Sequence, residues 1–297
     1  MGQGSVGIVG LGIMGGAIAR NLVERGWRVV GFDVSPERRD EAQAHGVALA
    51  ADVAELVRQA PLILTSLPGP EAAAATAKAI AAAEAGPRVV AEASTLALED
   101  KLAFETVMAA AGHAALDCPL SGTGAQARSR DLVVYASGAR DAIARAMPVF
   151  ADFAREAHDL GRFGNGTRMK LVANLLVAIH NVASAEAMVL GMKAGLDPDQ
   201  IVKLVSGGAG TSRIFELRAP MMAADRYEPA TMKTAIWQKD MDVIRRFAAE
   251  LGVETPLFSA SGPIYEAAVA AGLGAVDTAC VCRVIESRSG LRRREPA

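Results

Sequence analysis

The sequence predicts an α/β protein, with a doubly wound, mainly parallel sheet in the first part of the chain and an all-helical domain after it. Two observations support this prediction. In the first half, short runs of β-branched and other apolar residues alternate with longer stretches rich in Ala, Glu and Arg, as expected where strands alternate with helices. Beyond about residue 163 the alternation stops, and helical periodicity replaces it.

The expected strands are mostly apolar along their whole length, as in parallel strands that helices cover on both faces. In chain order they are SVGIVG from Ser5, WRVVGFD from Trp27, LILTSLP from Leu62, RVVAEAS from Arg88, AALDCPL from Ala114 and DLVVYASG from Asp131. Intervening segments such as 71–85, which is rich in alanine, have the composition of stable helices.

A long periodic segment from about Thr167 to Ala194 predicts a single helix of about 27 residues and about 40 Å. Its small residues permit close packing on all sides, so we expect a central helix buried by its neighbours. Shorter helices should follow, to about Ser287. The predicted domains are residues 1–163 and 164–297, with a flexible tail from about residue 288 that contains the basic run Arg292–Arg294.

The composition is that of a globular protein, with 51% hydrophobic and 22% charged residues. The net charge of −2 provides no overall basic field for nucleic acid. No signal peptide and no apolar run long enough to span a bilayer are expected, so we predict a cytoplasmic protein without membrane partners. The three cysteines lack the spacing of a metal site or of a disulfide framework.

The stretch GIVGLGIMGGAIARNL places Gly10, Gly12 and Gly15 in the spacing G-x-G-x-x-G. The first glycine allows a tight turn, the second lets the backbone approach a pyrophosphate, and the third permits close packing of helix on strand. Because the motif follows a predicted strand and opens a predicted helix, it indicates a Rossmann-type dinucleotide site. The phosphates would lie on the helix N-terminus, at Ile13 and Met14.

Asp33 follows the second predicted strand, 18 residues beyond Gly15. An acid at this place hydrogen-bonds the ribose 2′-hydroxyl of NAD and repels the 2′-phosphate of NADP. The next residue is Val34, which cannot bind a phosphate. Arg38 and Arg39 open the following helix and are read as solvated. The sequence therefore favours NAD over NADP.

The stretch GNGTRMKLVANLLVAIHN, from Gly164, puts Lys170 and Asn174 one helical turn apart, so both project from one face. A buried ammonium needs a partner or a catalytic role. Lys170 could take the hydroxyl proton when an alcohol is oxidised and return it in the reverse reaction, while Asn174 orients the substrate. The alternative is a surface lysine beside a solvated asparagine. Asn181 either extends this polar stripe or bonds a neighbouring helix.

Four ordered segments resemble the signatures of the β-hydroxyacid dehydrogenases, which include 3-hydroxyisobutyrate and L-threonate dehydrogenases. They are GLGIMGGAIARNL near the start, DCPLSGT from Asp117, GNGTRMKLVANLL from Gly164 and WQKDMDV from Trp237. The resemblance covers the chain from about Ser5 to Ser287. It implies a Rossmann domain, a helical domain like that of 6-phosphogluconate dehydrogenase, and an active site in the cleft between them.

The resemblance also implies residue roles. The catalytic lysine of the family falls on Lys170. The implied substrate-binding residues are Ser121, Gly122, Thr123, Asn174 and Lys239, and the implied cofactor contacts beyond the glycine motif are Leu67, Pro68, Thr95 and Lys239. Three positions depart from the family pattern: Thr123 replaces a glycine of the carboxylate-binding element, Glu92 replaces an aspartate before Ser94, and Leu96 stands where a proline usually follows Ser-Thr.

The predicted function is hydride transfer between NAD and the hydroxyl carbon of a small 3-hydroxy carboxylic acid, with Lys170 as general acid and base. Reduction of a small aldehyde acid or of an imine is the first alternative, and a non-catalytic dinucleotide-binding scaffold is the second. We expect a homodimer or homotetramer. Arg213, Phe215 and Arg218 could line the distal part of the substrate pocket, although a structural role fits each of them better.

Overall fold

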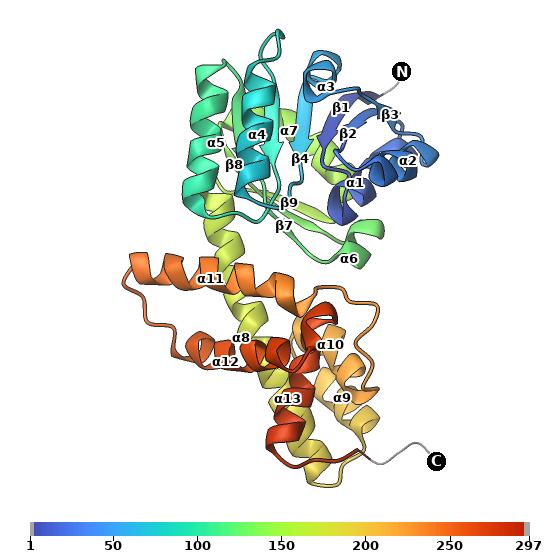
Figure 1. Ribbon diagram of the computed structural model, residues 1–297, viewed down its shortest axis with the longest axis vertical. Coiled ribbons are helices and arrows are strands. Elements are labelled where there is room, and N and C mark those ends of the chain that lie inside the picture. Colours follow the sequence, from blue (N-terminus) through green and yellow to red (C-terminus); the bar gives the residue numbers. More distant parts are fainter. Residues whose placement is uncertain (1–2, 294–297) are drawn as a thin grey trace. The chain divides into compact units, whose positions relative to one another are not determined.

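The computed structural model describes residues 3–293 and divides into two compact units, whose boundary in the chain lies between Lys170 and Leu171. The long helix α8 (Asn165–Lys193) begins in the first unit and continues in the second (Figure 1). The sequence placed the domain boundary at residue 163, just before this helix.

The first unit is built on a nine-stranded sheet with the order β3-β2-β1-β4-β5-β6-β8-β7, with β9 pairing to β8. The run β3-β2-β1-β4-β5-β6 is parallel, whereas β8 pairs antiparallel to β6 and β7. This mainly parallel order confirms the predicted fold class. The strands are β1 (Gln3–Val9), β2 (Trp27–Phe32), β3 (Ala48–Leu49), β4 (Leu62–Thr65), β5 (Val89–Glu92), β6 (Ala114–Asp117), β7 (Leu120–Ser121), β8 (Val133–Gly138) and β9 (Glu156–Asp159).

Helices cover both faces of this sheet (Figure 1). Side chains that alternate along the strands, such as Leu62 and Leu64 against Ile63, belong to two different apolar clusters. Helices α1 and α7 contribute to the first cluster, and α3, α4 and α5 to the second. The helices of this unit are α1 (Ile13–Glu24), α2 (Pro36–Ala44), α3 (Val53–Gln59), α4 (Pro70–Ala81), α5 (Leu98–Ala110), α6 (Gly124–Arg128) and α7 (Arg140–Phe153).

The second unit is helical, and its described residues, 171–293, form no strand beyond an isolated bridge between Lys233 and Asp277. Buried aromatic side chains such as Trp237 and Tyr265 form part of its interior. After α8 come α9 (Pro198–Ser206), α10 (Arg213–Ala223), α11 (Thr234–Glu250), α12 (Pro256–Ala270), the short 3₁₀ helices η1 (Leu273–Ala275) and η2 (Thr278–Cys280), and α13 (Val281–Arg288).

Helix α8 has about the predicted length. Two expectations about it are wrong: that neighbouring elements bury it on all sides, and that the sequence has no apolar run long enough to span a bilayer. Val172 and Leu190 are 54% and 74% exposed, so the other elements of this chain do not bury the helix on all sides. The helix is also long and apolar enough by composition to cross a membrane, with a mean hydropathy of 1.6 over its most apolar window. The core helices of soluble proteins pass the same criterion of length and composition.

Arg293, in the segment that was predicted to be a flexible tail, makes specific contacts with the helical unit. The guanidinium of Arg293 lies 2.6 Å from the carboxylate of Glu286 and donates a 2.8 Å hydrogen bond to the carbonyl of Ala223. Residue 294, the last of the basic run, lies outside the described residues.

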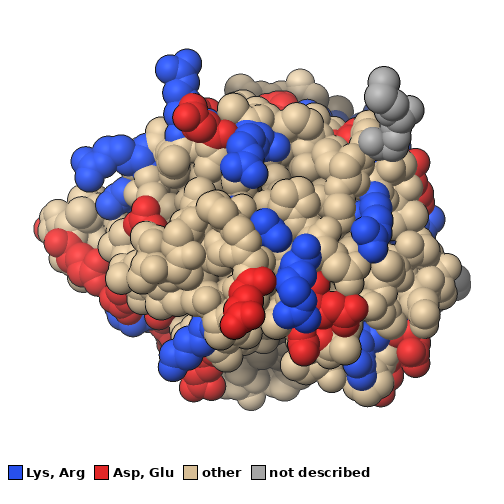
Figure 2. Space-filling model, turned by 90° about the horizontal axis from the view of Figure 1, so that it is seen from above, with Lys and Arg blue, Asp and Glu red and all other residues tan. Residues whose placement is uncertain are grey.

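On the face drawn in Figure 2, basic and acidic side chains are interspersed, in keeping with the small net charge.

Candidate active site

The glycine turn between β1 and α1 has the geometry that the sequence predicted. Gly10 has a φ of +91°, and a Cβ there would lie 2.1 Å from the carbonyl oxygen of Ser66. A Cβ on Gly15 would lie 1.9 Å from the carbonyl oxygen of Gly10. Only glycine fits at either position. A Cβ on Gly12, in contrast, would meet nothing within 4 Å, so the backbone is open where a ligand would approach.

Helix α1 begins at Ile13, and the residue before it, Gly12, provides no side-chain cap. The first amides of a helix have no acceptors within the helix, and they carry its positive end. Ser, Thr, Asp and Asn are the side chains preferred for capping these amides. The open and uncapped turn therefore fits the pyrophosphate of a dinucleotide.

Asp33 directly follows β2 and connects it to the glycine turn. One carboxylate oxygen accepts a 2.7 Å hydrogen bond from the backbone N–H of Leu11, and the other accepts 2.8 Å from that of Ser35. The side chain is half-buried, whereas Val34 beside it is 87% exposed. Each carboxylate oxygen can accept a further hydrogen bond, which leaves capacity for a ribose hydroxyl.

The loops that follow β4 and β5 lie at the same edge of the sheet as the glycine turn. The N–H of Ser66 donates 2.9 Å to the carbonyl of Val9, and the N–H of Leu67 donates 2.8 Å to the hydroxyl of Ser94. Thr95, beside Ser94, is half-buried, and Pro68 is exposed. The structure thus brings the predicted cofactor residues of the first unit together at the carboxyl ends of β1, β2, β4 and β5, where doubly wound folds bind nucleotides.

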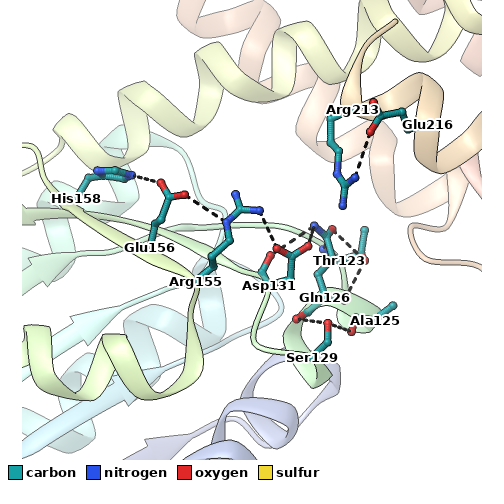
Figure 3. A network of polar contacts seen from close by, with 10 residues as sticks. All are labelled: Thr123, Ala125, Gln126, Ser129, Asp131, Arg155, Glu156, His158, Arg213 and Glu216. Atoms are coloured by element: carbon teal, nitrogen blue, oxygen red, sulfur yellow. Dashed lines mark hydrogen bonds and ion pairs between the residues drawn. The ribbon is translucent and has the colours of Figure 1, made fainter. Parts of the chain in front are cut away.

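The segment Ser121–Gly122–Thr123 connects β7 to α6, and a side-chain network holds its last residue (Figure 3). The backbone N–H of Thr123 donates 3.0 Å to Oε1 of Gln126, and its hydroxyl lies 3.3 Å from the same oxygen. The hydroxyl also caps the N–H of Gln126, which completes a capping box. The N–H of Thr123 already has an acceptor within the chain, a contact that the sequence reading did not include.

Gln126 is held in turn by residues farther along the network. Its amide nitrogen donates 3.0 Å to the carboxylate of Asp131, and Arg155 donates 2.8 Å to the other oxygen of that carboxylate. Arg155 also pairs with Glu156, which contacts His158 at 3.1 Å (Figure 3). The pattern Thr-x-x-Gln at 123–126 is a signal from which this capping box could have been predicted.

Lys170 and Asn174 project from one face of α8, as predicted, and both are buried, at 9% and 4% exposure. The amide nitrogen of Asn174 lies 3.5 Å from a carboxylate oxygen of Asp240, on α11. This contact directs the NH₂ group of Asn174 toward Asp240 and leaves the amide oxygen for another partner. Lys239, the neighbour of Asp240, is exposed. Burial of Lys170 is inconsistent with the alternative of a solvated surface lysine.

Other polar residues of the helical unit have structural roles. Asn181 donates to the hydroxyl of Tyr265 at 3.0 Å and to the carbonyl of Thr278 at 2.9 Å, so it bonds neighbouring elements and does not extend the polar stripe. Arg218 is buried and lies 3.4 Å from Asp277. Phe215 is buried, and Arg213 pairs with Glu216 at 3.1 Å.

Sequence reasoning missed a buried ionic cluster in the first unit. Lys101, on α5, lies between the carboxylates of Glu92 and Asp117, at the ends of β5 and β6, and none of the three side chains is exposed. The only hint in the sequence was that Glu92 replaces the aspartate of the resembled pattern. No cluster of metal-binding side chains occurs within residues 3–293.

Two protein families match the chain in succession. The family described as the NAD binding domain of 6-phosphogluconate dehydrogenase matches residues 5–162. The family described as NAD-binding of NADP-dependent 3-hydroxyisobutyrate dehydrogenase matches residues 164–285. Their descriptions name NAD and NADP, so they establish a nicotinamide dinucleotide without selecting one of the two.

Individual relatives match over nearly their whole length. The chain is 30% identical to L-threonate dehydrogenase of Cupriavidus necator, a match that covers 94% of this chain and 95% of the relative. It is 27% identical to glyoxylate/succinic semialdehyde reductase 1 of Arabidopsis thaliana, over 95% and 98% of the two chains. The solved structure of Mycobacterium tuberculosis 3-hydroxyisobutyrate dehydrogenase with L-serine superposes with a TM-score of 0.86 at 28% identity, and covers 96% and 99% of the two chains.

Proposed function

Since the chain belongs to the β-hydroxyacid dehydrogenase family and is therefore an NAD(P)-dependent oxidoreductase, we propose that it oxidises a small 3-hydroxy carboxylic acid with NAD and uses Lys170 as the general base. The observation that carries the proposal is the buried pair on α8, in which Lys170 lies one turn before Asn174. A buried amine one helical turn from a buried amide side chain fits proton transfer to and from a small polar substrate.

When bound, the dinucleotide would supply a nicotinamide ring as the acceptor of the hydride from the hydroxyl-bearing carbon. Neutral Lys170 takes the hydroxyl proton at Nζ, so that the alcohol becomes a carbonyl compound and the lysine becomes an ammonium. Asn174 accepts a hydrogen bond with its amide oxygen and holds the substrate hydroxyl or the ammonium in line. In reduction, the Lys170 ammonium returns the proton to the carbonyl oxygen.

The remaining assignments complete the proposed site. Ser121, Gly122 and Thr123 would bind the substrate carboxylate, and Lys239 would contact the substrate or the cofactor. The pyrophosphate would bind to the glycine turn and to Ile13 and Met14, and the rest of the cofactor to Leu67, Pro68 and Thr95. The Asp33 carboxylate favours the free 2′-hydroxyl of NAD and repels a 2′-phosphate. The exposed apolar side chains of α8 support a homodimer or homotetramer.

Reduction of a small aldehyde acid is the second candidate. Its support is the similarity to the Arabidopsis semialdehyde reductase. The same residues serve both directions, because the transition state for hydride transfer is shared. An imine reductase or a non-catalytic scaffold has less support, since neither needs a buried lysine at position 170.

Two panels of substrates test the proposal. The first contains hydroxyisobutyrate, glycerate, threonate and serine, each with NAD and with NADP, and the formation of NADH or NADPH is followed by absorbance. The second contains small aldehyde acids with the reduced cofactors. We expect turnover of at least one hydroxy acid, faster with NAD. Binding of NADH without turnover in either direction would instead identify a scaffold.

A further inference from the structure

The buried cluster around Lys101 connects elements of the first unit that carry the proposed chemistry. The ammonium contacts the carboxylate of Glu92, lies 3.2 Å from Oδ1 of Asp117, and donates 3.0 Å to the carbonyl of Glu92. These contacts satisfy the three N–H groups of the ammonium. The ammonium contact falls on Oε2 of Glu92, so the ion pair with Lys101 meets the charge of this carboxylate.

One branch of the cluster fixes the beginning of α8. Asp117 accepts 2.7 Å from the N–H of Thr167 and 2.8 Å from its hydroxyl, and the hydroxyl bond reaches the same oxygen that contacts Lys101. The N–H of Gly166 donates 2.9 Å to the hydroxyl of Ser137, which lies 3.3 Å from the other oxygen of Asp117. Each contact satisfies a polar group of the first helical turn that has no partner within the helix.

The backbone of this first turn also packs closely on the sheet. A Cβ on Gly166 would lie 2.3 Å from the carbonyl oxygen of Tyr135 and 2.6 Å from that of Asp117. The helix therefore touches β6 and β8 through its backbone. Lys170 follows Thr167 by three residues, about one turn, so the Asp117–Thr167 contact sets where the Lys170 side chain begins.

The other branch leads to the loop that is proposed to contact the cofactor. Oε1 of Glu92 accepts 3.0 Å from the N–H of Ser94 and 3.4 Å from the hydroxyl of Thr65. The hydroxyl of Ser94 in turn accepts from the N–H of Leu67. Ser94 precedes Thr95, so Glu92 holds the backbone on which Leu67 and Thr95 are placed.

Stability alone does not explain three buried charges. Burial of an ion pair costs desolvation energy that the pairing seldom exceeds, and apolar side chains of similar volume often serve as well or better. Burial lowers the pKa of Lys101, but the carboxylates of Glu92 and Asp117 outweigh it and raise the pKa above the usual value of lysine. The amine is therefore charged at neutral pH, and it balances two carboxylates that each hold a different part of the proposed site.

We propose that Lys101 is a positioning residue that fixes the start of α8 through Asp117 and the cofactor loop through Glu92, so that Lys170 is held in place relative to the nicotinamide. The inference rests on the proposed function in one respect, the role of Lys170 in proton transfer. Lys101 touches neither substrate nor cofactor in this scheme. Its effect on turnover is exerted entirely through the two carboxylates.

The test is Lys101→Met, which removes the charge and keeps most of the side-chain volume. We expect the crystal structure to show that Asp117 no longer bonds both Thr167 groups and that Lys170 Nζ has moved. Turnover should fall at least tenfold, since a misplacement of about 1 Å can lower a rate by two orders of magnitude. The KM for substrate should change less than kcat does, because the side chains of Asn174 and Ser121 are not substituted and Asn174 lies one turn farther from the displaced helix start.

Two further variants separate positioning from stability. Met108→Ala is the matched control, because Met108 is buried on α5, two turns after Lys101, and belongs to an apolar cluster. It should lower Tm while leaving kcat within twofold. Glu92→Leu combined with Lys101→Met removes the unpaired carboxylate and should restore Tm. Its kcat should stay low, because Asp117 still lacks its lysine.

The outcomes decide the inference in every case. A double variant with both Tm and kcat restored, or a Met108→Ala variant with an equal loss of kcat, would overturn it. If Lys101→Met does not fold, the Tm and kcat of the double variant test the positioning role in its place. If the wild-type protein turns over no hydroxy acid or aldehyde acid, the proposed function fails. The positions of Thr167 and Lys170 in the variant crystal structures then decide the positioning role separately, and unchanged positions refute it.

Discussion

The hydroxyl of Thr167 donates a 2.8 Å hydrogen bond to Asp117, and the backbone N–H of the same residue donates 2.7 Å to the other oxygen of that carboxylate. Asp117 is at the end of β6, and Thr167 is in the first turn of α8. The negative carboxylate lies at the positive end of a 29-residue helix, an arrangement that stabilises the helix start. One residue of the sheet thereby anchors the helix that carries Lys170 and Asn174.

Thr167→Val removes the hydroxyl and preserves the shape of the side chain. We expect the free energy of unfolding to fall by about 1–3 kcal/mol, because a buried charged acceptor loses one donor. Turnover should fall about tenfold through displacement of Lys170. The measurements are urea denaturation and steady-state kinetics. The matched control is Thr106→Val, whose exposed hydroxyl bonds the carbonyl of Leu102 within α5; a similar loss of activity there would argue against the anchor.

Lys170→Ala should lower kcat by about 10³-fold or more, because the alcohol loses the group that accepts its proton. The affinity for NADH, measured by fluorescence titration, should change by less than about threefold. Lys170→Arg is the informative companion, since a guanidinium remains protonated and cannot act as a base. Full turnover in the arginine variant would exclude proton transfer by this residue and leave only an electrostatic role.

The fold could be predicted from the sequence because its signals are local. The glycine motif, the apolar strands and the long helical period each lie within one segment, and the structure confirms the mainly parallel sheet and the helical second half. Strand β9 was missed because its sequence, Glu-Ala-His-Asp, is polar and lacks the pattern of a buried strand. Only pairing with β8 makes it a strand, and this information comes from the tertiary structure.

The candidate site was predicted less completely, for a related reason. Lys170 and Asn174 share a helix, so their relation follows from helical geometry. Lys101 contacts carboxylates at the ends of two different strands, and one sequence does not reveal such a contact. Thr123 replaces a glycine of the resembled pattern, and the sequence left open how this change affects the backbone path of the carboxylate-binding segment. In the structure it caps α6, and the resulting network engages its N–H.

Asp33→Ala tests the origin of cofactor preference. The ratio of kcat/KM for NAD to that for NADP should fall at least tenfold, because the variant loses both the acceptor for the 2′-hydroxyl and the charge that repels a 2′-phosphate. Asp33 also accepts hydrogen bonds from Leu11 and Ser35, so part of any loss with NAD would come from the disturbed turn. Asp33→Asn is a partial control for this, since it removes the charge and keeps one of the two acceptor oxygens that bond the turn. An unchanged ratio in both variants would refute the assignment.

Gln126→Ala tests whether the internal contact of Thr123 competes with a substrate carboxylate. The variant releases the N–H of Thr123 and should lower KM for hydroxy acids severalfold with little change in kcat, at a cost of about 1 kcal/mol from the lost capping box. Ser129→Ala is the control, because the hydroxyl of Ser129 bonds the carbonyls of Ala125 and Gln126 on the same short helix and does not touch Thr123. A fall of KM in both variants would point to loosening of α6 and not to competition.

The charge of Lys101 should also be visible in the pH dependence of stability. Its pKa is raised in the folded protein above the usual 10.5, because the attraction of Glu92 and Asp117 outweighs the effect of burial. The folded state therefore binds this proton more tightly than the unfolded state does. The stabilisation is fully present below about pH 10.5 and is lost as pH rises through the folded-state pKa.

Other groups titrate in the same range, because burial raises the pKa of Tyr265 and of Cys282 to about 12. The wild-type protein and Lys101→Met must therefore be compared at each pH. Thermal unfolding from pH 9 to pH 11.5 should show Tm falling more steeply in the wild type, so that the difference between the two proteins narrows as pH rises. A constant difference would mean that Lys101 does not lose its proton in this range, or that its charge does not stabilise the fold.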